Sequence, residues 1–305
     1  MDIVVTRAIS LAGIVLVGYA IKRLGWVRRE HFSVLAIIVL RVTLPCALIT
    51  SFNDFVITGT LTWLIVIGAA VNLIQQGATW LLTRHDTARR RSFAILHSGS
   101  YNVGAFAMPY AAQFAGPAAI VYTAMFDIGN SIAAGGIGYG WAMMIARGES
   151  MSLRRLAVTM LRSPVFDTYL VLLFLQLAHI RLPEQIIGFT SLIGQANPFC
   201  AMLMIGVGLD LALPARAWAT AAKFLARRYA FVIVFCLLMW YAIPSAVLSD
   251  QIKTIVIVVL WAPVAVMIAG FVDEAHGDVR LASLIASISV IIAIIMMPVV
   301  YMVLG

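Results

Sequence analysis

An asparagine, a glycine and a proline interrupt an otherwise apolar segment at Asn102-Val-Gly-Ala-Phe-Ala-Met-Pro109. A proline inside a helix removes one backbone hydrogen bond and clashes with the preceding turn. Asn102 and Gly104 stand seven and five residues before Pro109, so we expect an unwound stretch with free backbone groups that could bind a solute. The alternative is a kinked helix that only packs against its neighbours.

A second interruption is predicted at Trp261-Ala-Pro263, again inside an apolar segment. Helix breaks at equivalent places in two halves of a membrane protein are typical of a solute site near the middle of the bilayer. The two predicted breaks differ in character. Asn102 accompanies the first one, whereas the apolar run Val264-Ala-Val-Met267 follows the second.

Asp127 and Asn130 are three residues apart and therefore share one face of the predicted helix 117–146. Asp127 lies roughly 15 Å inside that segment at about 1.5 Å per residue. A carboxylate so deep in a membrane is costly unless it is protonated or paired. Asp127 is thus a candidate proton carrier, and Asn130 a candidate for binding the solute. The alternative is a structural carboxyl that is hydrogen-bonded to a neighbouring helix.

Arg41 lies about nine residues, or roughly 14 Å, from the nearer end of another apolar segment. A guanidinium can hold a carboxylate through two parallel hydrogen bonds. Arg41 is therefore a candidate anchor for an anionic solute. The alternative is a structural ion pair, for example with Asp127.

Other polar residues have two open interpretations each. Asn72, Gln75 and Gln76 line a cavity or bridge helices. His97 is a packed histidine or a proton relay. The run from Asp273 to Asp278 contains potential metal ligands, but we expect a solvated connector, and we expect no metal, no cofactor and, in the absence of catalytic motifs, no enzyme.

The elements that position these residues are apolar segments. The chain has 305 residues, of which 63% are hydrophobic and 11% charged, and its mean hydropathy is +1.01. A soluble surface needs more charge, so we expect an all-α integral membrane protein. The basic residues lie in short clusters between apolar runs, which argues against nucleic acid as a partner. The predicted spans are 4–22, 32–52, 57–82, 91–114, 117–146, 163–180, 186–212, 224–246, 252–272 and 280–303.

Lysine and arginine alternate between rich and poor loops along these ten spans. By the positive-inside rule, both termini face outward. Five spans in residues 1–146 and five in 147–305 then enter the membrane from opposite sides, as in an inverted repeat. The rich loops contain Lys22, Arg23, Arg28 and Arg29; Arg84, Arg89, Arg90 and Arg91; Arg147, Arg154, Arg155 and Arg162; and Arg216, Lys223, Arg227 and Arg228.

The set Tyr101–Pro109, Gly116 and Phe126–Asn130 resembles a motif of the bacterial auxin efflux carrier family, the prokaryotic relatives of plant PIN-FORMED proteins. Pro263 with Phe271–Asp278 also fits this family. The resemblance implies a fold similar to the bile acid–sodium symporters, with spans 1, 2, 6 and 7 as a scaffold and spans 3–5 and 8–10 as a transport domain. Spans 4 and 9 would cross at their broken middles.

The resemblance further implies elevator-type transport of small organic anions, such as auxin-like acids or dicarboxylates, by a homodimer in the bacterial inner membrane. Asn102, Pro109, Asn130, Pro263 and Arg41 would contact the solute. Arg41 is not part of the family motif. A ligand-binding membrane sensor and a channel are the alternatives.

Overall fold

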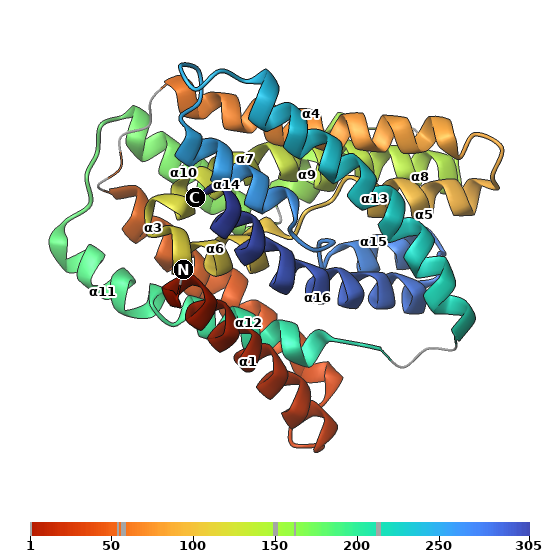
Figure 1. The fold of residues 1–305 in the computed structure, drawn as a ribbon, viewed down its shortest axis with the longest axis horizontal. Coiled ribbons are helices and arrows are strands. Elements are labelled where there is room, and N and C mark those ends of the chain that lie inside the picture. Colours follow the sequence, from red (N-terminus) through yellow and green to blue (C-terminus); the bar gives the residue numbers. More distant parts are fainter. Residues whose placement is uncertain (1, 54, 56–58, 149–151, 162, 212–214) are drawn as a thin grey trace.

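The computed structural model describes residues 2–53, 55, 59–148, 152–161, 163–211 and 215–305, and these residues form helices without strands (Figure 1). The predicted all-α class is confirmed. Within the described residues, five helical stretches are long and apolar enough to cross a membrane, which is compatible with an integral membrane protein. These stretches are Ile3–Arg23, Phe32–Asn53, Gly59–Leu82, Glu184–Gly208 and Val279–Leu304.

One group of helices packs around α1 (Asp2–Arg23) and α12 (Asn197–Gly208), which lie side by side along the lower edge of Figure 1. Glycine allows this close approach, because a Cβ added at Gly18 would lie 2.5 Å from the Leu203 carbonyl oxygen. The same group contains α3 (Leu44–Asn53) against α11 (Glu184–Gly194), together with α10 (Pro164–Leu177). We call these helices, with α2 (Phe32–Ile38), the first group.

The second group is built on α4 (Gly59–Leu82) and α7 (Ala118–Asn130). Their backbones touch at two glycines, since an added Cβ would strike the Phe126 carbonyl from Gly68 and the Ile65 carbonyl from Gly129. The other members of this group are α5 (Ala88–Ser98), α6 (Met108–Ala115), α8 (Tyr139–Arg147), α13 (Ala215–Ala242), α14 (Asp250–Leu260), α15 (Ile268–Glu274) and α16 (Val279–Leu304).

Two helical paths are interrupted: the second at the predicted Trp261–Pro263, and the first just before most of the predicted stretch Asn102–Pro109, which is helical from Val103 onward. Between α5 and α6 the chain leaves the helix at residues 99–102 and continues through the π-helical segment η3 (Val103–Ala107). Between α14 and α15 residues 261–267 are not helical. Pro109 does not make the first break, because it lies in α6, seven residues beyond Asn102, and residues 103–108 before it are helical.

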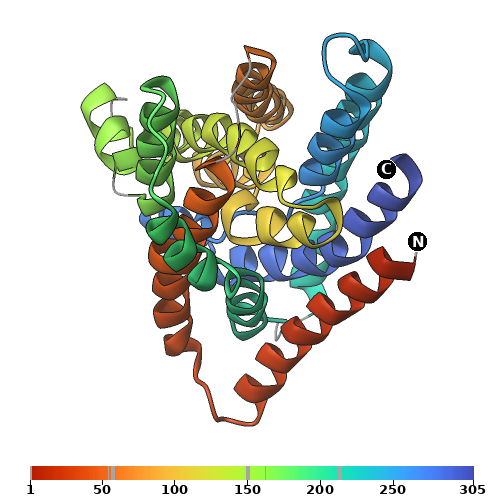
Figure 2. The ribbon, with the colours of Figure 1, turned by 90° about the vertical axis from the view of Figure 1, so that its left-hand side faces the viewer.

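Further π-helical segments occur at η2 (Val39–Thr43) and η4 (Ser131–Gly138), and a short helix α9 (Leu153–Leu161) follows residues 149–151, which lie outside the described part of the chain. The sequence analysis predicted neither the π-helical segments nor α9. The start of α1 and the end of α16 lie near each other, on one side of the molecule (Figures 1 and 2).

Candidate functional site

The two interruptions meet. The N–H of Asn102 donates to the carbonyl of Pro263 over 2.8 Å, and next to it the N–H of Val264 donates to Ser289 Oγ over 2.9 Å. Backbone groups that the breaks release are thus paired with each other or with a neighbouring side chain, as burial requires. We call this meeting point the crossover.

Asn130 holds the first break in place. Its Oδ1 accepts from the Tyr101 N–H over 3.2 Å, and its Nδ2 donates to the Tyr101 carbonyl over 3.0 Å. The side-chain amide therefore pairs with both backbone groups of one residue, as a neighbouring strand would. The same Nδ2 also donates to Asp127 Oδ1 over 2.7 Å, so the two residues share one helix face, as their spacing predicts.

Asp127 is buried, and every neighbour that contacts its carboxyl within the described residues is a donor. Asn130 donates to Oδ1, and the Tyr169 hydroxyl donates to Oδ2 over 2.8 Å. The backbone N–H of Gly104 is a third donor. Tyr169 belongs to α10 in the first group and Asp127 to α7 in the second, so this bond joins the two groups.

Arg228 is the functional candidate that the sequence analysis missed. It lies in α13, only 2% exposed, although it was assigned to a loop on the basis of its charge. Its guanidinium donates to the carbonyls of His97 (3.2 Å), Ser98 (2.8 Å) and Ala262 (3.2 Å), at the ends of the helices that precede the two breaks.

The amides of α4 are buried and have mainly bridging contacts. Gln75 Oε1 accepts from the Tyr101 hydroxyl over 2.8 Å, and its Nε2 donates to the Arg228 carbonyl over 3.3 Å. Gln76 donates to the Gly99 carbonyl over 2.8 Å, and Asn72 donates to Gly68 of its own helix. Gln75 and Gln76 thus bridge to other segments, whereas Asn72 bonds within its own helix.

His97 is also buried, at the end of α5. Its ring stacks on Phe93 with the centroids 4.1 Å apart, and Nδ1 lies 2.8 Å from the Phe93 carbonyl oxygen. Nδ1 must carry the hydrogen, because the carbonyl only accepts. Nε2 has no hydrogen-bond partner within the described residues.

Arg41 is exposed, in the π-helical segment η2, and it does not pair with Asp127, whose partners are named above. Asp210 is half-buried, and its N–H donates to Ser287 Oγ. In the connector from Asp273 to Asp278, Glu274 accepts from the Tyr139 hydroxyl over 2.5 Å. No cluster of potential metal ligands occurs in the described part of the chain.

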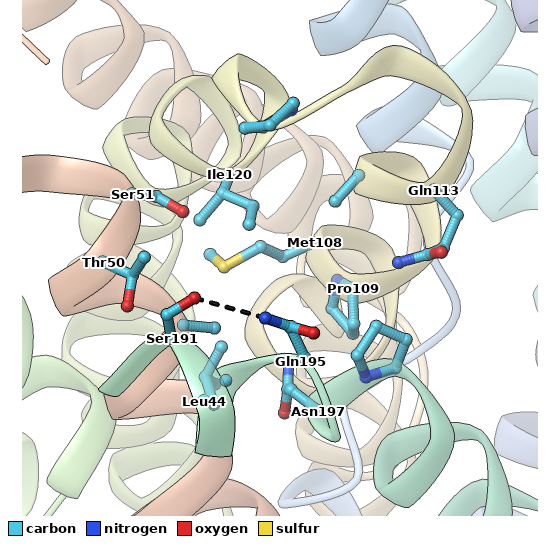
Figure 3. A pocket seen from close by; sticks show the side chains of 15 residues that line it. Leu44, Thr50, Ser51, Met108, Pro109, Gln113, Ile120, Ser191, Gln195 and Asn197 are labelled. Carbon is cyan, nitrogen blue, oxygen red and sulfur yellow. Dashed lines mark hydrogen bonds between the residues drawn. The ribbon is translucent and has the colours of Figure 1, made fainter. Parts of the chain in front are cut away.

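A cavity of about 420 Å³ lies against α6, the helix that follows the first break and η3 (Figure 3). Pro109, Met108 and Gln113 of α6 form one wall, and the opposite wall comes from α3 and the junction of α11 with α12. Its lining combines neutral polar groups with apolar side chains, and no charged side chain lines it. The polar lining residues are Thr50, Ser51, Gln113, Ser191, Gln195 and Asn197.

Three contacts organise the rim and wall of this first cavity. The Gln195 amide donates to Ser191 Oγ over 3.3 Å, as the dashed line in Figure 3 shows. Asn197 accepts from the Thr43 hydroxyl over 2.8 Å. Arg7, an exposed residue of α1, donates to the backbone carbonyl of Gln113, which places a cation at the rim.

A second cavity of about 260 Å³ lies beside the second break. Val264 and Val266 line it together with Ser283 and Ser287 of α16, while α2 and α12 contribute Phe32, Ile205, Gly208 and Leu209. The first cavity touches residues 44–51 and the second touches Phe32, so the two cavities lie at opposite ends of one helical path, roughly 20 Å apart at 1.5 Å per residue.

The fold and this site describe an all-α protein with helices long and apolar enough for a membrane, two interrupted helices that meet, and two cavities. Comparison with models of protein families and with characterised proteins finds no match to this chain.

Proposed function

We propose that this chain is a secondary active transporter of small organic anions, of the auxin efflux carrier type, with ten spans arranged as two inverted five-helix repeats. The observation that carries the proposal is the hydrogen bond from Asn102 to Pro263, with one cavity against α6, which follows the first break, and one cavity lined by the second break. Broken helices that meet near a solute cavity are typical of secondary transporters.

Both cavities lie between the same two groups of helices. Residues of α3, α11 and α12 face α6 across the first cavity, and residues of α2 and α12 face α16 and the second break across the second cavity. A displacement of the second group along the first would open one cavity while closing the other. The first group thus corresponds to a scaffold and the second to a moving transport domain, in an elevator-type cycle.

The lining of the first cavity favours an amphipathic anion with a single negative charge. Hydroxyl and amide groups offer donors to a carboxylate, and Met108, Leu44 and Ile120 offer an apolar surface. Two negative charges would lack a matching cation there, since Arg7 reaches only the rim. Among the anions expected from the sequence, an indole acid therefore fits better than a compact dicarboxylate.

Asp127 is the proposed site of proton coupling. In this conformation its two oxygens accept from three donors. A protonated carboxyl must donate from one oxygen, and of the three partners only the Tyr169 hydroxyl can turn to accept, because Asn130 is fixed by Tyr101. Protonation would therefore rearrange the one bond that joins Asp127 to the proposed scaffold.

The proposal places the protein in the bacterial inner membrane with both termini outside, as a homodimer through scaffold helices. The test is uptake of a labelled indole acid and a labelled dicarboxylate into proteoliposomes, with and without a pH gradient. We expect saturable uptake of the indole acid, with counterflow. Absence of carboxylate uptake would refute the proposal. Binding without uptake would indicate the alternative of a sensor, and single-channel currents would indicate a pore.

A further inference from the structure

Arg228 makes contacts with both interrupted helices at once. Its NH1 donates to the carbonyls of His97 and Ser98, which end α5, and its NH2 donates to the carbonyl of Ala262, just beyond the end of α14. Arg228 lies on a third helix, α13, and no carboxylate pairs with it in the described part of the chain.

Arg228 contacts helix C-termini, where a cation is electrostatically favourable. The last carbonyls of a helix have no partner within the helix, and the aligned peptide dipoles concentrate partial negative charge there. In a buried site without water these carbonyls would be costly to leave unpaired. One planar guanidinium, with its donors in a fixed fork, satisfies carbonyls of α5 and of the second break together.

The first break in turn holds Arg228. The Tyr101 ring lies against the guanidinium, with the central carbon 4.4 Å from the ring centroid. The Tyr101 hydroxyl donates to Gln75, whose amide donates to the Arg228 carbonyl. These contacts fix the orientation of the guanidinium. Arg228 can therefore hold the two breaks in a fixed relative position.

We propose that Arg228 is a positioning residue that locks the two breaks into one rigid unit and neutralises the negative ends of both helices. In the transporter proposed above, on which this role in transport rests, the crossover would then move as one body. The crossover would also offer no uncompensated helix C-terminus to a cationic solute.

The test is hydrogen exchange of the purified full-length protein in nanodiscs, which does not require a transport substrate. The reporters are the amide of Asn102, protected by the Pro263 carbonyl, and the amide of Val264, protected by Ser289. We expect Arg228→Met to raise exchange at both amides by about 10-fold or more, the factor for losing a charge-assisted hydrogen bond. Exchange along α1 and α12 should stay unchanged.

The matched control is Arg227→Gln, which removes the neighbouring charge. Arg227 lies over the Phe224 ring at 5.3 Å and should leave both reporter amides unaffected. Where Arg228→Met is not recovered folded, Arg228→Lys replaces it, because an ammonium cannot match the fork geometry, and a smaller rise at both amides is expected. Exchange that rises evenly in all helices, at only one break or at neither would overturn the inference.

A second measurement separates charge from packing. In Arg228→Ala, added methylguanidinium should restore slow exchange at Asn102, and methylammonium should do so less well. Equal effects of the two cations, or no effect of either, would show that Arg228 is an ordinary core residue. Failure of the wild type to take up any solute would refute the transport proposal but would leave both of these measurements interpretable.

Discussion

Replacing Asp127 with asparagine tests whether a carboxylate, rather than any polar group, organises the first break. The substitution keeps the shape but leaves one acceptor oxygen. If the new NH2 faces Asn130, a donor meets a donor, since Asn130 Nδ2 lies 2.7 Å from Oδ1. If it faces the other way, the Tyr169 hydroxyl must turn to accept, and its own hydrogen loses the acceptor Oδ2.

Either orientation leaves one buried donor without a partner. An unpaired buried group of this kind costs about 1–3 kcal/mol, so we expect Asp127→Asn to lower the free energy of unfolding by about that amount. Unfolding can be followed by titration with SDS in mixed micelles. Asp127→Asn with unchanged stability would refute the donor arrangement described here.

Tyr169→Phe supplies the matched variant, because it removes only the hydroxyl that lies 2.8 Å from Oδ2. A hydrogen bond to an ionised group contributes about 1.5–3 kcal/mol and a neutral one about 0.5–1.5 kcal/mol. We therefore expect Tyr169→Phe to cost more in the wild type than in the Asp127→Asn background. Equal costs in the two backgrounds would show that the bond is not made to a carboxylate. In proteoliposomes, uptake by Asp127→Asn should no longer respond to a pH gradient, and a retained response would exclude Asp127 as the proton carrier.

Three further outcomes are expected. Gly129→Ala should lower the unfolding free energy by about 1–3 kcal/mol or more, because its Cβ would strike the Ile65 carbonyl. Gly77→Ala should be tolerated, because no atom lies within 4 Å of an added Cβ there. Equal effects of the two substitutions would contradict the backbone contact of α4 with α7. Hydrogen bonds from Lys253 and Ser245 lower the pKa of Asp250 in the folded protein. The stabilising effect of Asp250 is therefore present above its unfolded pKa of about 3.9 and is lost as the pH falls through the lower folded pKa. The melting temperature should fall more steeply below about pH 4 in the wild type than in Asp250→Asn. Gln195→Ala should raise the KM for the transported anion by about 5- to 10-fold, the effect of one lost hydrogen bond, with Gln176→Ala, outside the cavity, as control; an unchanged KM would move the site away from the first cavity.

The sequence predicts those structural features that depend on residues close together in the chain. Pro263 disfavours a continuous helix by its own backbone chemistry, and the second break lies there; the first break includes Asn102 but lies at residues 99–102, and Gly104 is within η3. Asp127 and Asn130 share one helix face, as their spacing of three residues predicts, and their side chains are hydrogen-bonded. Such features depend only on neighbours along the chain, so a single sequence contains them.

A single sequence does not predict contacts between segments that are far apart in the chain. Arg228 follows Arg227 and Lys223, so charge counting assigned all three to a loop, whereas α13 begins at Ala215 and places Arg228 well inside the helix. Tyr169 gives no signal, because an apolar helix often contains a tyrosine. Arg41 was chosen by depth along its helix, but depth does not determine which side of the helix faces the protein, and its side chain is exposed.

The two buried charged residues at the crossover contact opposite kinds of helix end. Asp127 accepts from the Gly104 N–H near the start of η3 and α6, where the dipole end is positive, and Arg228 donates to carbonyls where α5 and α14 end, where it is negative. Tyr101 and Asn130 connect the two charges through hydrogen bonds and the ring contact. Each charge is thus stabilised by the helix ends that it contacts, and two buried helix breaks become tolerable because an acid and a base pair with backbone groups that the breaks leave free. In the proposed transporter, a proton arriving at Asp127 would rearrange its bond to Tyr169 of α10 and leave the contacts of Arg228 intact.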